Sequence, residues 1–331
     1  MDMHNKGKNI LARTTPRIKR SALVLPHPGG SDKSARVAGL RLRIGSANVG
    51  TFRRKCGEVA VMAGRRRLDF CCLQETRWKG CGSRILGDYK FYWMGCEEGM
   101  AGVGVLVSDV WMERVLEVRR VSERLMLVRV RVGEGVLNVF SVYAPQVGRA
   151  ADEKEDFLVQ LGKSLSAVDA REQVVICGDF NGHVGAGSDG FENVHGGHGY
   201  GVRNVEGEMM LEFATAMDLV IANTWFTKTD GKLVTYESGG CKSVVDYIMV
   251  RKSERSMIRN VAVLQGEDCI PQHKLLVCML EMKGALGKKG KRTNYANKVR
   301  VWKLREDTLR QAFQTRVKER FDRRLDMQGT V

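Results

Sequence analysis

The 331-residue sequence lacks long apolar runs and has none near the roughly 18 uncharged residues that a membrane-spanning helix requires. Its first residues lack the apolar core of a secretory signal peptide. Internal repeats are also absent, which argues against a solenoid. We therefore expect a soluble intracellular protein that has no membrane partner.

The nine cysteines include no CxxC pair, and no histidines accompany them at zinc-ligand spacing. Cys71, Cys72, Cys177 and Cys278 lie within apolar runs, where a free thiol acts as a small hydrophobic side chain. The pattern argues against a zinc module, and free thiols within apolar runs predict a reducing compartment.

Proline is scarce, with five residues, but 43% hydrophobic and 28% charged residues match an ordinary globular protein. Residues 1–40 contain eight Lys and Arg against two acids, and residues 283–331 contain fifteen against five. The ends thus carry +6 and +10, which accounts for the net charge of +16 and leaves residues 41–282 neutral. We expect a disordered basic arm at 1–40, one folded domain at 41–282, and a basic linker with an amphipathic helix at 283–331. Basic arms on a neutral body are typical of polyanion binding, although such tails also promote solubility or nuclear import.

Strand patterns dominate residues 41–282. Apolar residues recur at helical spacing in Arg53 to Arg67, in Asp152 to Ala170 and in a segment that Asn204 caps. The strands are expected at 42–49, 68–74, 102–107, 125–132, 136–143, 173–177, 219–223, 244–250, 261–264 and 275–280. Many strands with few helices predict an α+β fold in which two packed sheets are flanked by helices.

Polar residues stand at or just after the ends of several apolar strands. They are Asn48, Glu75, Tyr143, Asp179 with Asn181, and Asp246, while His273 precedes the last strand. Strand ends at one edge of a sandwich converge, so these acids could form an oxygen-ligand site for a hard cation. Taken singly, each also has a structural explanation, such as an Asx turn at Asp179 or a half-buried aromatic at Tyr143.

Six ordered motifs contain these residues: Gly45-Ser46-Ala47-Asn48-Val49, Leu73-Gln74-Glu75-Thr76-Arg77, Val142-Tyr143-Ala144-Pro145, Gly178-Asp179-Phe180-Asn181, Val245-Asp246-Tyr247-Ile248 and the late His273. In this order the chain resembles the endonuclease/exonuclease/phosphatase superfamily over residues 41–282. Within the superfamily the chain looks most like the apurinic-type endonucleases of non-LTR (LINE- and RTE-type) retrotransposons and the craniofacial development protein 2-like host proteins derived from them. The stretches that carry this resemblance are Gly197-His198-Gly199-Tyr200-Gly201 with Arg203-Asn204, Asn223-Thr224-Trp225-Phe226 and Gln272-His273-Lys274-Leu275-Leu276. The resemblance implies a four-layer αββα sandwich of two mixed sheets.

The resemblance also implies a metal-dependent hydrolase that cuts phosphodiester bonds of DNA. Glu75, with Asn48 nearby, would hold Mg²⁺, and Mn²⁺ would serve the same role. Asp179 would orient or deprotonate the attacking water, with Asn181 donating to the phosphate. In an extended chain Asp179 and Asn181 would face one side while Phe180 points into the core.

The remaining implied roles concern the phosphate. His273, oriented by Asp246, would donate to a phosphate oxygen, and the Tyr143 hydroxyl would stabilise the transition state. The expected contacts to phosphate or DNA are Asn48, Asn181, His273, Gln146 and Trp225. The sequence departs from the family pattern at Gln272, where an acid often precedes the late histidine, at Gly50, where an acid is frequent, and at Gln146, which replaces an asparagine.

Two other functions stay open at this point. A phosphatase or phosphodiesterase of the same superfamily would act on other phosphate esters, and a domesticated DNA- or chromatin-binding protein would have weak or no activity. We expect the protein to be a monomer that binds DNA. The sequence indicates no protein partner. The basic clusters Arg17 to Arg20 and Lys288 to Arg292 predict a nuclear location.

Overall fold

The computed structural model describes residues 39–282 and Gln311. The expected arm at 1–40, except its last two residues, and the expected linker and helix at 283–331, except Gln311, lie outside the described residues. Strand β1 begins at Leu40, one residue before the expected domain boundary. In the part of the chain that the structure describes, no helix has the length and apolarity needed to cross a membrane.

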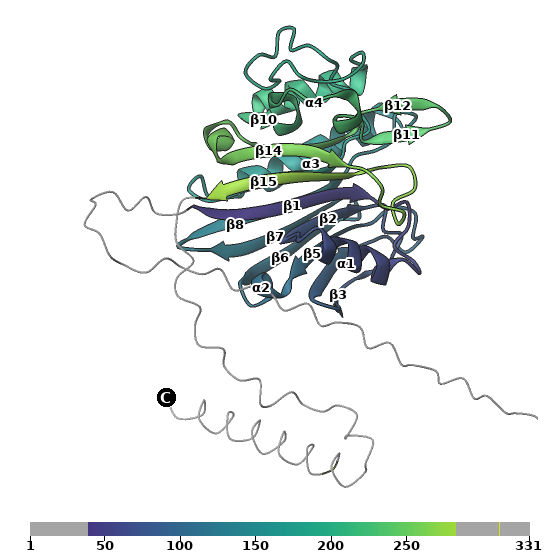
Figure 1. The fold of residues 1–331 in the computed structure, drawn as a ribbon, viewed down its shortest axis with the longest axis vertical. Helices are drawn as coiled ribbons and strands as arrows, with labels where there is room; N and C mark the ends of the chain where they lie inside the picture. The colour runs from purple at the N-terminus through teal and green to yellow at the C-terminus, as the bar shows by residue number, and fades with distance from the viewer. Residues whose placement is uncertain (1–38, 283–310, 312–331) are drawn as a thin grey trace, which may run out of the picture. The chain divides into compact units, whose positions relative to one another are not determined.

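Two β-sheets form the centre of the folded body (Figure 1). The seven-stranded sheet has the order β14-β15-β1-β2-β5-β4-β3. Its strands are β1 (Leu40–Asn48), β2 (Phe70–Gln74), β3 (Cys81–Leu86), β4 (Tyr89–Met94), β5 (Val103–Ser108), β14 (Ile258–Leu264) and β15 (Leu275–Met282).

The six-stranded sheet has the order β10-β13-β9-β8-β7-β6. Its strands are β6 (Val115–Ser122), β7 (Leu125–Val132), β8 (Gly135–Tyr143), β9 (Gln173–Asp179), β10 (Leu219–Ile221) and β13 (Asp246–Arg251). The pairs β1–β2 and β8–β9 are parallel while their other neighbours are antiparallel, so both sheets are mixed.

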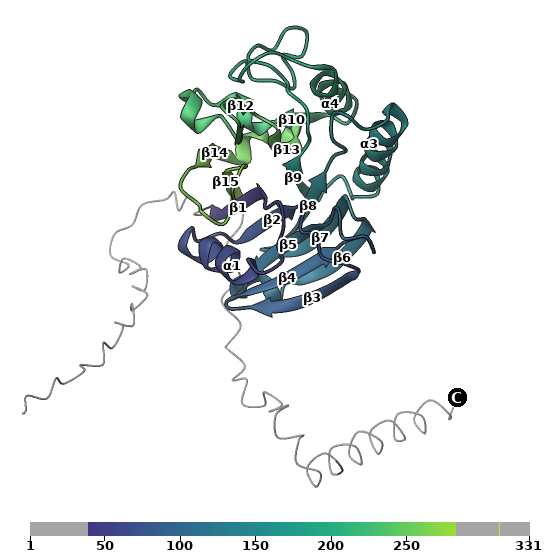
Figure 2. The same ribbon diagram turned by 90° about the vertical axis from the view of Figure 1, so that its right-hand side faces the viewer.

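Apolar side chains of the strands explain the layers. Leu42 and Ile44 of β1 lie with Val128 and Val139 of the other sheet in a buried core between the sheets. Helix α1 (Cys56–Arg65) covers the outer face of the seven-stranded sheet, whereas α3 (Ala151–Ser166) and α4 (Val205–Ala216) cover the outer face of the six-stranded sheet (Figure 2). The predicted αββα sandwich is therefore confirmed.

Several elements of the structure were not expected from the sequence. Strands β3 and β6 lie at sheet edges and are largely exposed or half-buried, so they lack the clear apolar alternation of a buried strand. The short strands β11 (Tyr236–Ser238) and β12 (Cys241–Ser243) form a separate hairpin. The other short elements are α2 (Asp109–Met112) and the 3₁₀ turns η1 (Ala222–Trp225), η2 (Asp230–Lys232) and η3 (Lys252–Met257).

Local backbone geometry explains where the expected boundaries differ. Helix α1 begins at Cys56, after expected Arg53, because Arg54 has a left-handed φ of 62°. The strand expected at 219–223 ends at Ile221, where the turn η1 starts. The predicted Asn204 cap of α4 is confirmed, since its side chain accepts a 2.8 Å hydrogen bond from the Gly207 N–H.

Candidate active site

Strand pairing brings the polar strand ends to one edge of the sandwich. Asp179 at the end of β9 lies opposite Tyr143 at the end of β8 and opposite Asp246 at the start of β13. In the other sheet, Asn48 ends β1 opposite Gln74, so Glu75 directly follows the neighbouring strand. Contacts between β1 and β9 connect the two sets of strand ends.

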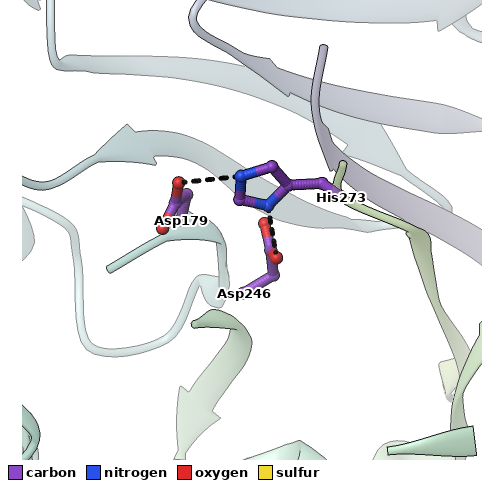
Figure 3. A group of neighbouring side chains, drawn as sticks. All are labelled: Asp179, Asp246 and His273. Carbon is purple, nitrogen blue, oxygen red and sulfur yellow. Dashed lines mark hydrogen bonds and ion pairs between the residues drawn. The ribbon is translucent and has the colours of Figure 1, made fainter. Parts of the chain in front are cut away.

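His273 lies between two buried carboxylates (Figure 3). Its Nδ1 is 2.9 Å from Asp246 Oδ2, and its Nε2 is 3.7 Å from Asp179 Oδ2. The side chains of Asp179, Asp246 and His273 are 2%, 0% and 11% exposed. Because a carboxylate only accepts hydrogen bonds, the Asp246 contact assigns a proton to Nδ1 and directs Nε2 toward Asp179.

Asp179 is fixed by two further hydrogen bonds. Its Oδ1 accepts from the Asn181 N–H at 3.0 Å, which is an Asx turn, and its Oδ2 accepts from Asn48 Nδ2 at 3.0 Å. The structural explanation of Asp179 and its place in the cluster are therefore both correct. Phe180 is buried as expected, but Asn181 is not extended: it has a φ of 49°, and its side-chain amide donates to the Ala144 carbonyl at 2.9 Å.

Burial and neighbouring charges change the proton affinities in this cluster. Burial raises the pKa of Asp179 to about 7, and the negative charge of Asp246 adds to the shift, while His273 and the donors Asn48 and Asn181 oppose it. For His273, burial lowers the pKa, but Asp246, Asp179 and Glu75 outweigh it and raise the value to about 9. A positive His273 beside a negative Asp179 is thus the state that the environment favours between these values.

Tyr143 is buried, with its hydroxyl near the same charges. Burial raises the pKa of Tyr143 well above its usual value, and Glu75 and Asp179 raise it further, whereas Arg124 and a hydrogen bond with Gln146 oppose the shift. The Arg124 guanidinium lies 5.3 Å from the centre of the Tyr143 ring. The tyrosine therefore remains a neutral hydrogen-bond donor at physiological pH.

Glu75 has a more exposed position than the buried cluster. It has a left-handed φ of 54°, and its carboxylate, 15% exposed, pairs with the 48% exposed side chain of Arg77. Glu75, Arg77, Arg124, Tyr143 and Gln146 line a cleft of about 430 Å³. A bulky substrate can therefore reach Glu75 and Tyr143 from the same cleft.

The oxygen donors at this edge fit a hard divalent cation. Glu75 offers a solvent-accessible carboxylate, and Mg²⁺ commonly uses one or two carboxylates together with water and a phosphate. Asn48 is less available, because its Nδ2 donates to Asp179 and its Oδ1 accepts from the Gly50 N–H at 2.9 Å. Asp179, Asp246 and His273 also have ligand atoms within 4.8 Å of one another, but a cation there would have to replace the His273 contacts.

Two other residues singled out from the sequence, Gln272 and Trp225, have defined surroundings. Gln272, where an acid is frequent, donates from Nε2 to Ser238 Oγ at 3.2 Å on the β11–β12 hairpin. Trp225 donates its indole N–H to the Val194 carbonyl at 3.3 Å and has the Arg255 guanidinium 4.0 Å from its ring centre. These contacts connect Trp225 to the segment around Val194 and to Arg255. Its role as a DNA contact stays a prediction.

Thr235, Tyr236 and Asn223 belong to the site although no sequence pattern singled out their roles. Thr235 Oγ1 accepts hydrogen bonds from the Val245 and Asp246 N–H groups, and Asn223 Nδ2 donates to the Asp246 carbonyl at 2.9 Å. The Tyr236 ring packs edge-on against His273, with ring centres 4.8 Å apart. These contacts join distant segments, so spacing along the chain could not reveal them.

No family model matches the chain. Craniofacial development protein 2 of Bos taurus is 28% identical over 222 residues, which cover 66% of this chain and 37% of that protein. The transposon TX1 uncharacterized 149 kDa protein of Xenopus laevis is 33% identical over 105 residues, 31% of this chain and 7% of that protein. The chain thus spans well under half the length of the curated relatives that it matches.

Solved structures share the fold at low sequence identity. The Xenopus laevis APE2 catalytic domain matches with a TM-score of 0.57 and 14% identity over 74% of this chain and 94% of that chain. The AP endonuclease LMAP from Leishmania major matches with a TM-score of 0.55 and 10% identity over 73% of this chain and 88% of that chain.

The endonuclease domain of TRAS1, a telomere-specific non-LTR retrotransposon, matches with a TM-score of 0.52 and 15% identity over 73% of this chain and 99% of that domain. The chain therefore shares the fold of these three structures and is similar in sequence to craniofacial development protein 2, as the resemblance of its motifs predicted.

Proposed function

We propose that the chain is a divalent-metal-dependent endonuclease that hydrolyses phosphodiester bonds of DNA. The observation that carries the proposal is the row Asp179, His273 and Asp246 at the strand ends, beside the cleft that Glu75 and Tyr143 line. A buried acid, an oriented histidine and an accessible carboxylate are the groups that metal-assisted hydrolysis requires.

Each side chain has a role that fits its position. Asp179 accepts a proton from, or orients, the attacking water, and Asn48 and the Asn181 N–H keep its carboxylate in place. Protonated His273 donates from Nε2 to a phosphate oxygen, while Asp246 holds its Nδ1–H. Tyr143 donates its hydroxyl to the transition state.

The amide of Asn181 and the cleft complete the phosphate site. One amide hydrogen of Asn181 bonds the Ala144 carbonyl, which leaves the second to donate to a phosphate oxygen. A Mg²⁺ or Mn²⁺ ion held by Glu75 would polarise the phosphate and neutralise charge on the leaving 3′ oxygen. Gln146 lines the cleft beside Tyr143, where a DNA strand would pass.

The comparisons and the charge distribution support DNA as the substrate. One structural neighbour is named as an AP endonuclease and another as the endonuclease domain of a retrotransposon, and TX1 is named as a transposon. The charges of +6 and +10 outside residues 41–282 match a polyanion, so we assign non-specific DNA affinity mainly to those ends. The basic clusters at 17–20 and 288–292 fit a nuclear location, which a fluorescent fusion with both clusters changed to Gln would test.

The proposal is tested by incubating the full chain with supercoiled plasmid and Mg²⁺ or EDTA. We expect nicked circles with Mg²⁺ alone, and none with Asp179→Ala or His273→Ala. If the wild type and both variants are equally silent, the domesticated binding protein replaces the endonuclease. If instead small phosphate esters are hydrolysed and duplex binding does not weaken with salt, a phosphatase of the same superfamily replaces it.

A further inference from the structure

Thr235 contacts Asp246 and the residue that follows His273, and it is not among the residues that line the cleft. Its side chain is fully buried. Oγ1 accepts hydrogen bonds from the Val245 and Asp246 N–H groups, both at 3.1 Å, and its carbonyl accepts from the Lys274 N–H at 2.7 Å. One residue therefore fixes the backbone of Asp246 and the residue that follows His273.

The hairpin that follows Thr235 strengthens this connection. Tyr236 forms an antiparallel bridge with His273, and the Glu237 N–H donates to the Gln272 carbonyl at 2.9 Å. Lys274 Nζ bonds Glu237 Oε2 at 2.8 Å. His273 is thus held on one side by the hairpin and on the other by Asp246, and Thr235 joins the two supports.

We infer that Thr235 is a positioning residue that sets the distance and orientation between Asp246 and His273 for phosphodiester hydrolysis. The inference rests on the proposed function and extends it to a residue that touches neither water nor phosphate. A hydroxyl is needed because one side-chain oxygen with two lone pairs serves two adjacent N–H groups. An apolar side chain of the same shape would leave both N–H groups without their acceptor and would let the Asp246 segment move.

The test compares Thr235→Val, which keeps the shape of the side chain, with Thr235→Ser, which keeps the hydroxyl. We expect Thr235→Val to lower kcat for plasmid nicking about 100-fold, the usual effect of a misplacement near 1 Å, with little change in KM. Thr235→Ser keeps the hydroxyl, so its kcat should stay within about threefold of the wild-type value. Thr224→Val is the matched control, because Thr224 is also buried and its Oγ1 accepts the Gly196 N–H at 2.9 Å, outside the Asp246–His273 pair.

A second readout does not depend on activity. The His273 ring nitrogens, identified by their loss in His273→Gln, are followed by nitrogen NMR in the full chain. In Thr235→Val the Nδ1–H signal should move or broaden, whereas in Thr235→Ser and Thr224→Val it should stay as in wild type. If Thr235→Val does not fold, Thr235→Cys replaces it, since a thiol keeps the size but accepts hydrogen bonds weakly.

The outcomes separate the two proposals. Unchanged kcat and an unchanged His273 signal in Thr235→Val would overturn the positioning role, as would equal losses in Thr235→Val, Thr235→Ser and Thr224→Val. An inactive wild type would remove the proposed endonuclease, but the His273 signal would still decide whether Thr235 orients the pair.

Discussion

The two sheets contribute unlike halves to the candidate site. The six-stranded sheet supplies Asp179 and Asp246, which enclose His273 and are almost fully buried, and every one of these side chains has at least one fixed partner. The seven-stranded sheet supplies Glu75, whose carboxylate opens into the cleft and pairs with the half-exposed Arg77. In the proposed mechanism the buried half is arranged in advance for proton transfer, whereas the exposed half exchanges its partner for an ion.

The two halves therefore have separate energetic requirements. Burial and the negative charge of Asp246 both raise the pKa of Asp179 and so favour its protonation. The histidine between the two carboxylates opposes this rise. The Glu75 carboxylate stays in contact with solvent. To bind a cation it would give up only its ion pair with the exposed Arg77, and such exposed ion pairs are generally weak.

The largest expected effect comes from removing the groups of the buried half that meet the substrate. Asp179→Asn and His273→Ala should each lower the nicking rate on the order of 10³-fold, within the range for a lost general acid or base. The measurement is the initial rate on supercoiled plasmid at saturating Mg²⁺. A rate within threefold of wild type for either variant would contradict the assignment of that residue.

A smaller loss is expected when the support of His273 changes but its ring stays. Asp246→Asn removes the acceptor charge at Nδ1, so the imidazole loses its preferred tautomer and orientation. We expect a loss on the order of 10²-fold in kcat with little change in KM. An Asp268→Asn control, at an acid that lines a pocket with His273 but is not a member of the Asp179–Asp246–His273 cluster, should keep the wild-type rate.

The exposed half should respond in the opposite direction. Arg77→Ala removes the partner of Glu75, so the carboxylate becomes free for a cation and half-maximal Mn²⁺ binding should occur at about two- to fivefold lower concentration, as expected from the strength of an exposed ion pair. Binding is measured by the electron spin resonance signal of free Mn²⁺. The control is Lys79→Ala, which removes another exposed positive charge close in sequence. Weaker Mn²⁺ binding by Arg77→Ala than by this control would contradict the exchange of Arg77 for a cation at Glu75.

The smallest expected effect concerns stability and its dependence on pH. The pKa of Asp179 is raised in the folded state to about 7 from an ordinary value near 3.8, so the folded protein binds the proton more tightly and loses stability as the pH rises from about 4 through 7. Asp179→Asn should therefore raise the Tm at pH 8 by a few degrees, with less gain at pH 5. Glu75→Gln, on the exposed side, should change the Tm little at either pH, and the reverse ranking would contradict the contrast between the halves.

The sequence predicted the strand ends well because buried strands have a simple pattern. The apolar runs before Asn48, Glu75, Tyr143 and Asp179 locate these residues at one edge once two packed sheets are assumed. The cap at Asn204 was predictable for a similar reason, since a single local hydrogen bond defines it.

The remaining features depend on tertiary contacts that no local pattern encodes. The left-handed backbone of Asn181 combines the local Asx turn of Asp179 with a bond from the Asn181 side chain to the distant Ala144 carbonyl, and only the second depends on the tertiary fold. Thr235 gains its role only because the β11–β12 hairpin meets the segments around Asp246 and His273. The edge strands β3 and β6 were missed because their exposed residues need not be apolar.

The most direct test of the account is the fate of the water that attacks the phosphate. The full chain is incubated with duplex DNA and Mg²⁺ in ¹⁸O-labelled water, and the products are analysed by mass spectrometry. We expect unlabelled 3′-hydroxyl ends, and 5′-phosphates that contain the label. The labelled product should be absent with Asp179→Asn and with EDTA. Unlabelled 5′-phosphates, 3′-phosphates, or the same labelled product from the Asp179 variant would contradict hydrolysis by water held at Asp179.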